Sequence, residues 1–374
     1  MLSTAAWLAA TGCSVFDAGT QVQHSDARIV EQFPIDRYGA PTAGAPSDID
    51  PAGNGTTVCP PLSIAVAVPL SGPDATLGRG IRNGIQLAVD EHNGANAGCQ
   101  IQLKPFDTEG DAGAAEQAAR QLVDDAFTIG VIGPAGSDEA AVAGPVFDDA
   151  GIVAITPSAT RPELAARGWR TFLRGLANSA VQGVAVANYL RRTMGSSGVC
   201  VLDDGDPAGA EVVRVVRETL GPAADPACSA TVGDDPHALD AVIAAEPDAV
   251  FFSGGDTQAA VLAGRLRGSG ADLQFLTVGG VPEPETSMQA AESVTYREFV
   301  AAYTDKFGEP PAAFSATGYD LGAILLNGID AGAWTRPALL DRVRASTARG
   351  LDRTYRWSVN GELVDPPVWV SRLQ

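Results

Sequence analysis

The sequence is poor in basic residues and in histidine. Lys and Arg number 25 against 45 Asp and Glu, which gives a formal net charge of −20. A surface of this sign repels nucleic acid and anionic lipid, so we expect neither as a partner. The histidines, His24, His92 and His237, stand in no motif with a nucleophile. A hydrolase is therefore not supported, and we expect a protein that is no enzyme and holds no cofactor and no metal.

Long apolar runs are also missing. Beyond the N-terminus no run reaches 18 residues, so we expect no transmembrane helix there. A short apolar stretch at the N-terminus leads into Ala10-Thr11-Gly12-Cys13, and small residues directly before a Cys resemble the lipobox of bacterial lipoproteins. We therefore expect residues 1–13 to be a lipoprotein signal segment, lipidated at Cys13, with the lipid as the sole attachment to the membrane. No Lys or Arg precedes the stretch, which departs from the signal-peptide pattern and leaves a frayed terminus with a free Cys as the alternative.

Periodicity is absent between residues 14 and 57. This segment is rich in Gly, Pro, Ala, Asp and Thr and shows neither a helical nor a strand period. Segments of such composition bury too little apolar surface to fold by themselves. The segment is therefore expected to be a disordered tether.

The remainder of the chain alternates strands with helices and is long enough for two domains. In the first series the expected strands are Ser63–Val68, Ile101–Phe106, Thr128–Ile132 and Ile152–Ile155, and the expected helices are Gly80–Asn93 and Ala112–Asp125. In the second series the expected strands are Gly198–Leu202, Ser229–Val232, Ala249–Ser253 and Gln274–Val278. The expected helices are Ala180–Thr193, Gly209–Leu220, Pro236–Ala245 and Thr257–Gly268. Two helices follow, Tyr296–Phe307 and Gly318–Ala331. This alternation predicts an α/β protein with doubly wound, mostly parallel sheets.

Two consecutive strands of the first series end in loops that carry hydroxyl groups. Gly133-Pro134 stops the first strand, and Ser137 follows where a helix N-cap is expected. The second strand ends in Thr156-Pro157-Ser158-Ala159-Thr160. Both loops should lie at the carboxyl edge of one parallel sheet, where free N–H groups of helix N-termini favour anions. Ser137 and Thr160 could each serve only as helix caps, but the shared edge favours contact with a ligand.

These segments resemble the branched-chain amino-acid-binding family, the type I periplasmic solute receptors of ABC importers, from about residue 64 to residue 329. The matching pieces are VAVPLSGPDATLG at 66–78, FDTEGDAGAAEQAARQLVDD at 106–125, IGPAGS, ITPSATRPEL, FLRGLANSAVQG at 172–183 and FVAAYTDKFGEPPAAFSATGYDLGAILLNGI at 299–329. The resemblance implies two Rossmann-like lobes joined by a multi-strand hinge that the chain crosses several times. Lobe I is expected to comprise residues 58–178 and 296–347, and lobe II residues 179–295 and 348–374.

The resemblance also implies ligand contacts. In the family, the equivalents of Ser137, Ser158, Ala159 and Thr160 hold the α-carboxylate of the ligand, and Leu77 is a further candidate. Lobe II departs from the family pattern, because Gly279 stands where amino-acid-binding members carry the carboxylate that pairs with the α-ammonium. An ammonium without a counter-charge is costly to bury. Asp206 and Asp256 are the candidate replacements.

Two aromatic positions of the family pocket are also replaced, one by Pro207 or Ala208 and one by Gly255. We therefore expect leucine, isoleucine and valine to bind poorly, and another small carboxylate or amino-acid derivative to bind instead.

Four cysteines remain once Cys13 is set aside as the lipid site. Cys59 and Cys99 precede the first two strands of the first series, and Cys200 and Cys228 stand near the starts of the first two strands of the second series. In a doubly wound fold such strands are neighbours, so we expect the disulfides Cys59–Cys99 and Cys200–Cys228 among the three pairings that four cysteines allow. All four should lie opposite the binding edge. Two disulfides fit an oxidising, extracytoplasmic compartment.

Two other chemistries have partial motifs. Gly78-x-Gly80-x-x-x-Gly84 after the first strand, with Asp107 ending the second, imitates a dinucleotide fingerprint, but its spacing differs by one residue. A nicotinamide-dependent oxidoreductase is therefore a remote alternative. Asp203-Asp204-Gly205-Asp206 resembles a fragment of a calcium loop but lacks the later Gly and Glu, so a solvated turn is favoured.

The sequence thus predicts a lipid-anchored extracytoplasmic solute receptor, expected to be a monomer, that binds a small molecule and passes it to an ABC permease. An extracellular sensor or scaffold with the same fold and no transport role is the alternative.

Overall fold

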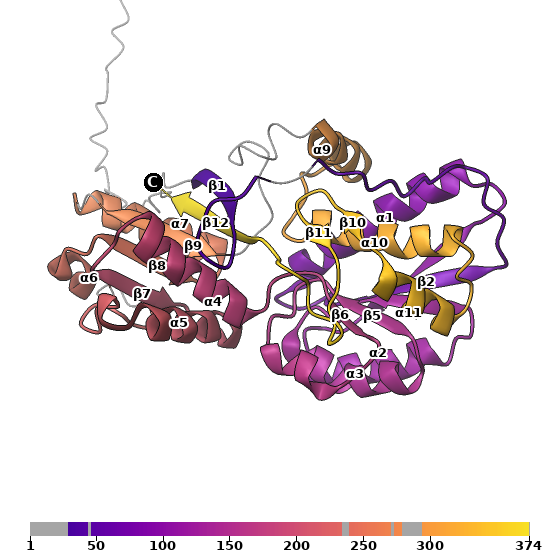
Figure 1. Ribbon diagram of the computed structural model, residues 1–374, viewed down its shortest axis with the longest axis horizontal. Helices are drawn as coiled ribbons and strands as arrows, with labels where there is room; N and C mark the ends of the chain where they lie inside the picture. Colours follow the sequence, from indigo (N-terminus) through magenta and orange to yellow (C-terminus); the bar gives the residue numbers. More distant parts are fainter. Residues whose placement is uncertain (1–28, 44–45, 234–238, 271–272, 279–293, 374) are drawn as a thin grey trace, which may run out of the picture.

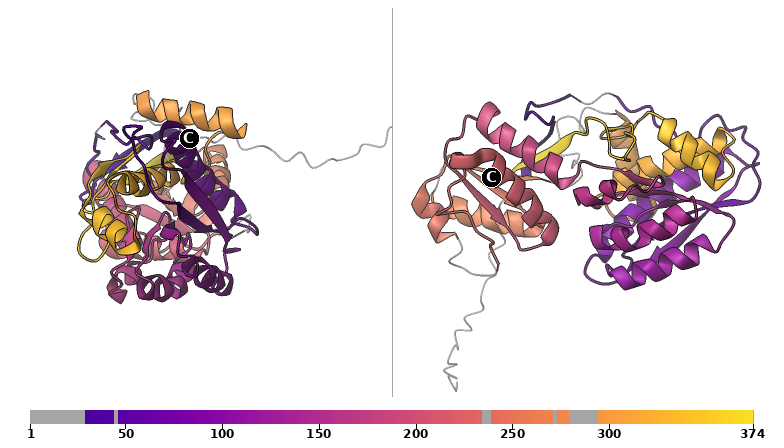
Figure 2. Two further views of the ribbon diagram at one scale, coloured as in Figure 1. Left: turned by 90° about the vertical axis from the view of Figure 1, so that its right-hand side faces the viewer. Right: turned by 60° about the horizontal axis from the view of Figure 1, so that its bottom comes forward.

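The structure is a computed structural model that describes residues 29–43, 46–233, 239–270, 273–278 and 294–373. It contains two lobes, each a β-sheet covered by helices on both faces (Figure 1). The right-hand view of Figure 2 shows the lobes apart, joined by connecting segments of chain. The predicted two-lobed α/β fold is confirmed. Within the described residues, no helix is both long and apolar enough to cross a bilayer.

Lobe I is built on a five-stranded sheet whose paired strands are all parallel. The strands are β2 (Leu62–Val68), β3 (Ile101–Asp107), β4 (Thr128–Ile132), β5 (Val153–Thr156) and β6 (Phe172–Arg174), in the order β3-β2-β4-β5-β6. Every residue of β2, β4, β5 and β6 is buried, as continuous apolar runs predict for strands covered on both faces. The carboxyl ends of β4 and β5 therefore open at one edge of this sheet.

Helices cover both faces of the lobe I sheet. One face carries α1 (Ala75–Ala95), α9 (Val294–Phe307), α10 (Ser315–Asp330) and α11 (Arg336–Ala345), and the other carries α2 (Ala112–Val123) and α3 (Ser137–Asp149). Helices α1 and α10 pack backbone against backbone. A Cβ atom on Gly84 would lie 2.0 Å from the Ser315 carbonyl oxygen, and one on Gly318 would lie 2.4 Å from that of Ile81. Glycine is required at both positions because any side chain would separate the two helices.

Lobe II is built on a mixed sheet of order β1-β12-β9-β8-β7. Strands β7 (Val199–Asp203), β8 (Ala249–Ser253) and β9 (Gln274–Val278) are parallel, and β12 (Val368–Leu373) runs antiparallel to β9. The sheet packs against α4 (Ser179–Asn188), α5 (Pro207–Leu220), α6 (Asp240–Ala245) and α7 (Asp256–Gly268). Helix α4 continues as a π-helical turn, Tyr189–Thr193, and a 3-10 turn, Gly221–Ala223, follows α5.

The prediction of a tether through residue 57 is wrong for the described part of that segment. Residues Ile29–Ile35 form β1, which pairs antiparallel with β12 and completes the lobe II sheet. The chain then passes to lobe I, where Asp48 pairs with Arg349, at 2.8 Å between Oδ2 and Nε. Before this crossing, Thr42 is bonded to lobe II, because its N–H donates to the Pro34 carbonyl at 2.9 Å. The segment has no local period because its strand is stabilised by a partner more than 330 residues away.

Two further expectations are corrected. Residues 229–232 form no strand beside β7 and make only an isolated bridge, Asp203 to Thr231, because the Ser229 hydroxyl accepts the Val201 N–H that a neighbouring strand would take. Residues 348–363 belong to lobe I rather than lobe II. Their short hairpin, β10 (Ala348–Arg349) with β11 (Thr354–Tyr355), packs on the lobe I core, and only β12 returns to lobe II.

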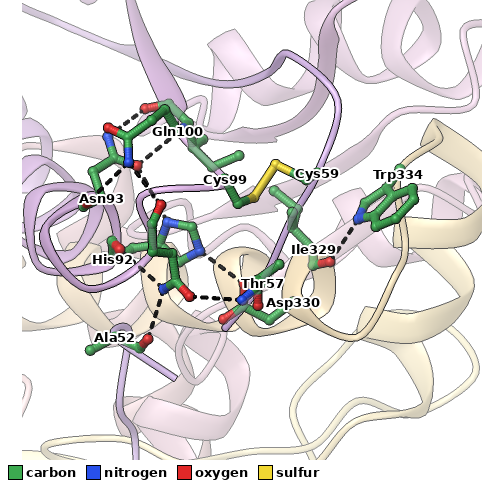
Figure 3. The surroundings of a disulfide bond; sticks show 12 residues. Ala52, Thr57, Cys59, His92, Asn93, Cys99, Gln100, Ile329, Asp330 and Trp334 are labelled. Carbon is green, nitrogen blue, oxygen red and sulfur yellow. Dashed lines mark hydrogen bonds and ion pairs between the residues drawn. A yellow bond between two sulfur atoms is a disulfide. The ribbon is translucent and has the colours of Figure 1, made fainter. Parts of the chain in front are cut away.

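Both predicted disulfides are present. Cys59 and Cys99 join the segments before β2 and β3, with Cα atoms 4.8 Å apart, and Cys200 joins Cys228 with Cα atoms 5.3 Å apart. Around the first bond, shown in Figure 3, the Asn96 amide donates to the Ala52 carbonyl at 2.8 Å and accepts from the Thr57 N–H. These bonds hold the N-terminal segment against α1. Each disulfide lies within one lobe, at the amino ends of its strands and away from the edge where β4 and β5 open.

Candidate functional site

A cleft of about 580 Å³ lies where the two lobes face each other. From lobe I it is lined by loops that follow β2, β3, β4 and β5. From lobe II it is lined by the first turns of α4 and α5 and by Asp206, the N-cap of α5. The cleft therefore lies at the carboxyl edge of the parallel strands, where the sequence placed the binding site.

The two hydroxyl-bearing loops are bonded to each other. The Ser137 hydroxyl oxygen accepts the N–H groups of Thr160 and Arg161, both at 3.2 Å. The Ser158 hydroxyl donates to the Ala135 carbonyl at 3.0 Å. The Thr160 hydroxyl lines the cleft and makes no hydrogen bond within the described chain. The loops thus form one surface that presents a free hydroxyl toward the cleft.

Arg174 supports this surface from below. Its guanidinium is fully buried and donates to the carbonyls of Ala159 and Arg161, the latter at 2.8 Å. It also pairs with Glu362, with Nε 3.0 Å from Oε2. Burial lowers the pKa of Arg174, and the charge of Glu362 opposes that effect. This role could not be predicted from the sequence, because Glu362 is 188 positions away along the chain.

Charged side chains surround the hydroxyls. Arg161 donates to Asp138 at 2.6 Å at the rim of the cleft. Glu139 lies on the first turn of α3, is 3% exposed, and accepts the Gly136 N–H at 2.6 Å. The sequence analysis did not name Arg161, Asp138 or Glu139. Glu139 accepts the N–H of the N-cap residue Gly136, as the Glu of a capping box does, and its place in the first turn of α3 could have indicated this bond.

Most of the predicted site residues line the cleft. They are Leu77, Ser137, Ser158, Thr160 and Asp206. Ala159 is 1% exposed and does not line the cleft, because its N–H turns inward to the Thr156 hydroxyl. The Asp256 side chain and Gly279 lie outside the described residues.

Comparison with known proteins identifies the family. The sequence model described as periplasmic binding protein matches residues 61–374. The chain belongs to the periplasmic binding protein family. It is 30% identical to the Leu/Ile/Val-binding protein BraC3 of Rhizobium johnstonii over 231 residues, which are 60% of this chain and 63% of that protein. It is 25% identical to the leucine-, isoleucine-, valine-, threonine- and alanine-binding protein of Pseudomonas aeruginosa, over 76% of this chain and 83% of that protein.

Solved structures share the fold of this periplasmic binding protein. The substrate-binding protein LivJ of Streptococcus pneumoniae, in complex with isoleucine, superimposes with a TM-score of 0.68 and 23% identity, covering 82% of this chain and 95% of that one. A solute-binding protein of R. palustris in complex with benzoate gives 0.68 and 18%, covering 83% and 92%. At these identities the likeness establishes the fold.

The glycines that imitate a dinucleotide motif have a packing role in this periplasmic binding protein. A Cβ atom on Gly78 would lie 1.7 Å from the Pro69 carbonyl oxygen, whereas those on Gly84 and Gly80 would lie 2.0 Å from the carbonyl oxygen and 3.0 Å from the hydroxyl of Ser315 at the start of α10. The motif therefore seats α1 against β2 and α10. The acidic turn is likewise structural, because Asp204 accepts the N–H groups of Asp206 and Gly255, and Asp206 caps α5.

One group of residue types that bind metals occurs in the described part of the chain. Ligand atoms of His92, Cys99 and Asp330 lie within 4.8 Å of one another. The Cys99 sulfur is bonded to Cys59, and His92 Nε2 lies 2.9 Å from Asp330 Oδ1, so both are already engaged (Figure 3).

Proposed function

We propose that the protein is an extracytoplasmic receptor that captures a small carboxylate-bearing ligand between its lobes and delivers it to an ABC permease. The observation that carries the proposal is the cleft between the lobes, where Ser137, Ser158 and Thr160 converge at the carboxyl edge of a parallel sheet. A hydroxyl that lines such a cleft without a partner is available to donate to a bound carboxylate. Contacts from both lobes would stabilise the closed form, which is how a permease could sense occupancy.

The relatives support a carboxylate ligand without naming it. By their names they bind leucine, isoleucine, valine, threonine or alanine, and the structures include complexes with isoleucine and benzoate. All of these molecules carry a carboxylate, whereas their other ends differ. The alignment covers 63% of the Rhizobium protein and 65% of the Escherichia coli Leu/Ile/Val-binding protein, so substrate and permease are proposals for this chain.

The site itself is tested by Thr160→Val, which removes the hydroxyl and nearly preserves the volume. Mass spectrometry of small molecules released from the purified protein identifies the ligand, and calorimetry then measures its affinity. Losing a hydrogen bond to a charged group should weaken binding by about 10- to 150-fold. Thr304→Val, on α9 and outside the cleft, is the matched control and should bind as wild type does. Equal affinity of wild type and Thr160→Val would refute the proposed site.

The anchor is a separate proposal. With Cys13 acylated, the protein should sediment with membranes, and Cys13→Ala should release it into the soluble fraction. Equal membrane retention of the two forms would exclude lipidation at Cys13 and would leave the cleft unaffected.

A further inference from the structure

The cleft is strongly acidic. Among the described residues that line it, Arg161 is the single cation, against the carboxylates of Asp74, Asp138, Glu139, Glu163, Asp206 and Glu211. Fixed charges of one sign in a partly desolvated cleft disfavour ligands of the same sign. A cleft built only for an anion would not be expected to carry this surplus.

Three of these carboxylates are already engaged by the protein. Asp138 pairs with Arg161 at 2.6 Å, so the single cation among the described lining residues is already opposed. Glu211 accepts two hydrogen bonds from Arg214, at 2.7 and 2.9 Å, and Asp206 accepts the Ala208 N–H at 2.8 Å. Asp74 and Glu139 form no ion pair among the described residues, and they influence each other electrostatically.

Glu139 is the more unusual of these two. Its Oε2 accepts the Gly136 N–H, whereas Oε1 is buried and has no hydrogen-bond partner among the described residues. Burial raises the pKa of Glu139, the Thr108 hydroxyl opposes the rise, and the charges of Asp74 and Asp111 add to it. Neither Oε1 nor the Thr108 hydroxyl makes a hydrogen bond of normal geometry within the described part of the chain, so the charged form of Glu139 is only weakly compensated and a nearby cation would stabilise it.

Asp74 contributes a second uncompensated charge. It occupies the N-cap position of α1 but makes no capping hydrogen bond, and no other bond of its side chain occurs within the described residues. It lines the same cleft as Glu139 and influences it electrostatically. Asp74 and Glu139 thus both line the cleft, and neither forms an ion pair with a cation of the described chain.

We propose that the ligand carries a net positive charge, with a side-chain ammonium or guanidinium lying against Asp74 and Glu139 while its carboxylate meets Ser137 and Thr160. This inference rests on the proposed function and names the class of ligand, amino acids with a basic side chain. Such a cation supplies several N–H donors and can pair with the exposed Asp74, while its charge offsets that of the mostly buried Glu139. A neutral zwitterion such as leucine leaves both carboxylates unbalanced.

Titration calorimetry at low ionic strength tests the inference with L-lysine, L-arginine and L-ornithine against L-leucine and L-glutamate. At least one basic amino acid should bind 10-fold or more tightly than leucine, and glutamate should bind weakest. Asp74→Asn and Glu139→Gln should each weaken the preferred basic ligand about 10-fold and change leucine less than 2-fold. Asp149→Asn removes the same charge from the exposed end of α3, outside the cleft, and should change neither affinity beyond 2-fold.

The outcomes separate this inference from the proposed function. Leucine or glutamate binding as tightly as every basic amino acid would overturn the charge assignment and leave the receptor role intact. Unchanged basic-ligand affinity in Asp74→Asn would do the same, and this variant alters an exposed side chain that makes no hydrogen bond, so folding does not confound it. Thermal stabilisation by calcium chloride that Asp74→Asn abolishes would also overturn it, by showing that a metal ion fills the position. If no carboxylate-bearing compound binds, the proposed function itself fails.

Discussion

The two lobes share a layered α/β architecture but contribute differently to the cleft. Lobe I supplies paired loops, bonded through Ser137 and supported by the buried Arg174, so its half of the site is held in place before a ligand arrives. Lobe II supplies Ser179, Asp206, Pro207, Ala208 and Glu211 from two helix starts, with no cation among the described lining residues. The comparison teaches that lobe I presents the free Thr160 hydroxyl and four of the six lining carboxylates, whereas lobe II contributes Asp206 and Glu211.

The largest expected effect concerns close packing at glycines, which we expect to be tighter in lobe I than in lobe II. Gly84→Ala should cost more than about 4 kcal/mol of unfolding free energy, because its Cβ would lie 2.0 Å from a backbone oxygen of α10. In lobe II, Gly183→Ala should cost less, about 2–3 kcal/mol, because its Cβ would lie 2.6 Å from the Val215 Cβ and 3.0 Å from the Val212 carbonyl oxygen, a smaller overlap than at Gly84. Chemical denaturation measures both. Gly94→Ala, in the same helix as Gly84 with nothing within 4 Å, is the control and should stabilise by up to about 1 kcal/mol. Similar losses at Gly84 and Gly183 would remove the distinction between the lobes.

The disulfides give a test in which the lobes should behave alike. Their sequence separations are 40 and 28, for which the chain-entropy estimate gives about 3.9 and 3.6 kcal/mol. Replacing both cysteines of either pair by Ala should therefore cost about 2–4 kcal/mol. Denaturation of the two double variants checks this, with peptide mapping of each to show that the other bond is retained. A loss confined to one variant would show that one lobe contributes most of the measured stability.

Lowering the pH is expected to have a smaller effect on the free energy of unfolding. Hydrogen bonds from Lys104 and Thr128 lower the pKa of Asp125 in lobe I to about 2. Because the folded-state pKa lies below the unfolded value, this stabilisation is complete above about pH 4 and is lost as pH falls toward 2. The Asp125 side chain is about 25% exposed at the surface, so solvent screening should keep the change to about 1 kcal/mol. Stability curves of wild type and Asp125→Asn should converge as pH falls, and parallel curves would contradict the assignment.

In lobe II, Asp248 accepts the N–H groups of Ser197 and Gly198, which lower its pKa as well. Asp248→Asn should therefore lose stability in the same direction as Asp125→Asn.

Local patterns in the sequence predicted most of the fold. Four strands of lobe I, β2 to β5, were predicted to within one or two residues, and the neighbouring strand starts identified both disulfides, whereas β6 was not predicted. Strand β1 could not be found this way, because Ile29–Ile35 has no local period and gains its stability from β12. Residues 229–232 look like a strand, but the hydroxyl of Ser229 takes the place of a ladder hydrogen bond.

Half of the candidate site could also be predicted from the sequence. Hydroxyl groups placed after adjacent parallel strands indicate a shared edge, so Ser137, Ser158 and Thr160 could be predicted. The charge distribution of the cleft could not be predicted, because the sequence does not show which carboxylates, such as Glu139, become buried. Arg174 was missed for a related reason, since its partner Glu362 becomes a neighbour only after the chain has returned to lobe I.

The N-terminal crossing sets a limit on how far the lobes can separate. Thr42 is held on lobe II by the Pro34 carbonyl, and Ser47 is held on lobe I by the Arg349 carbonyl at 3.0 Å. Five residues of extended chain reach at most about 18 Å, so these two points cannot move further apart while both bonds persist. The segment between Thr42 and Ser47 therefore limits the opening of the lobes at this point. A wider separation requires one of the two hydrogen bonds to break first.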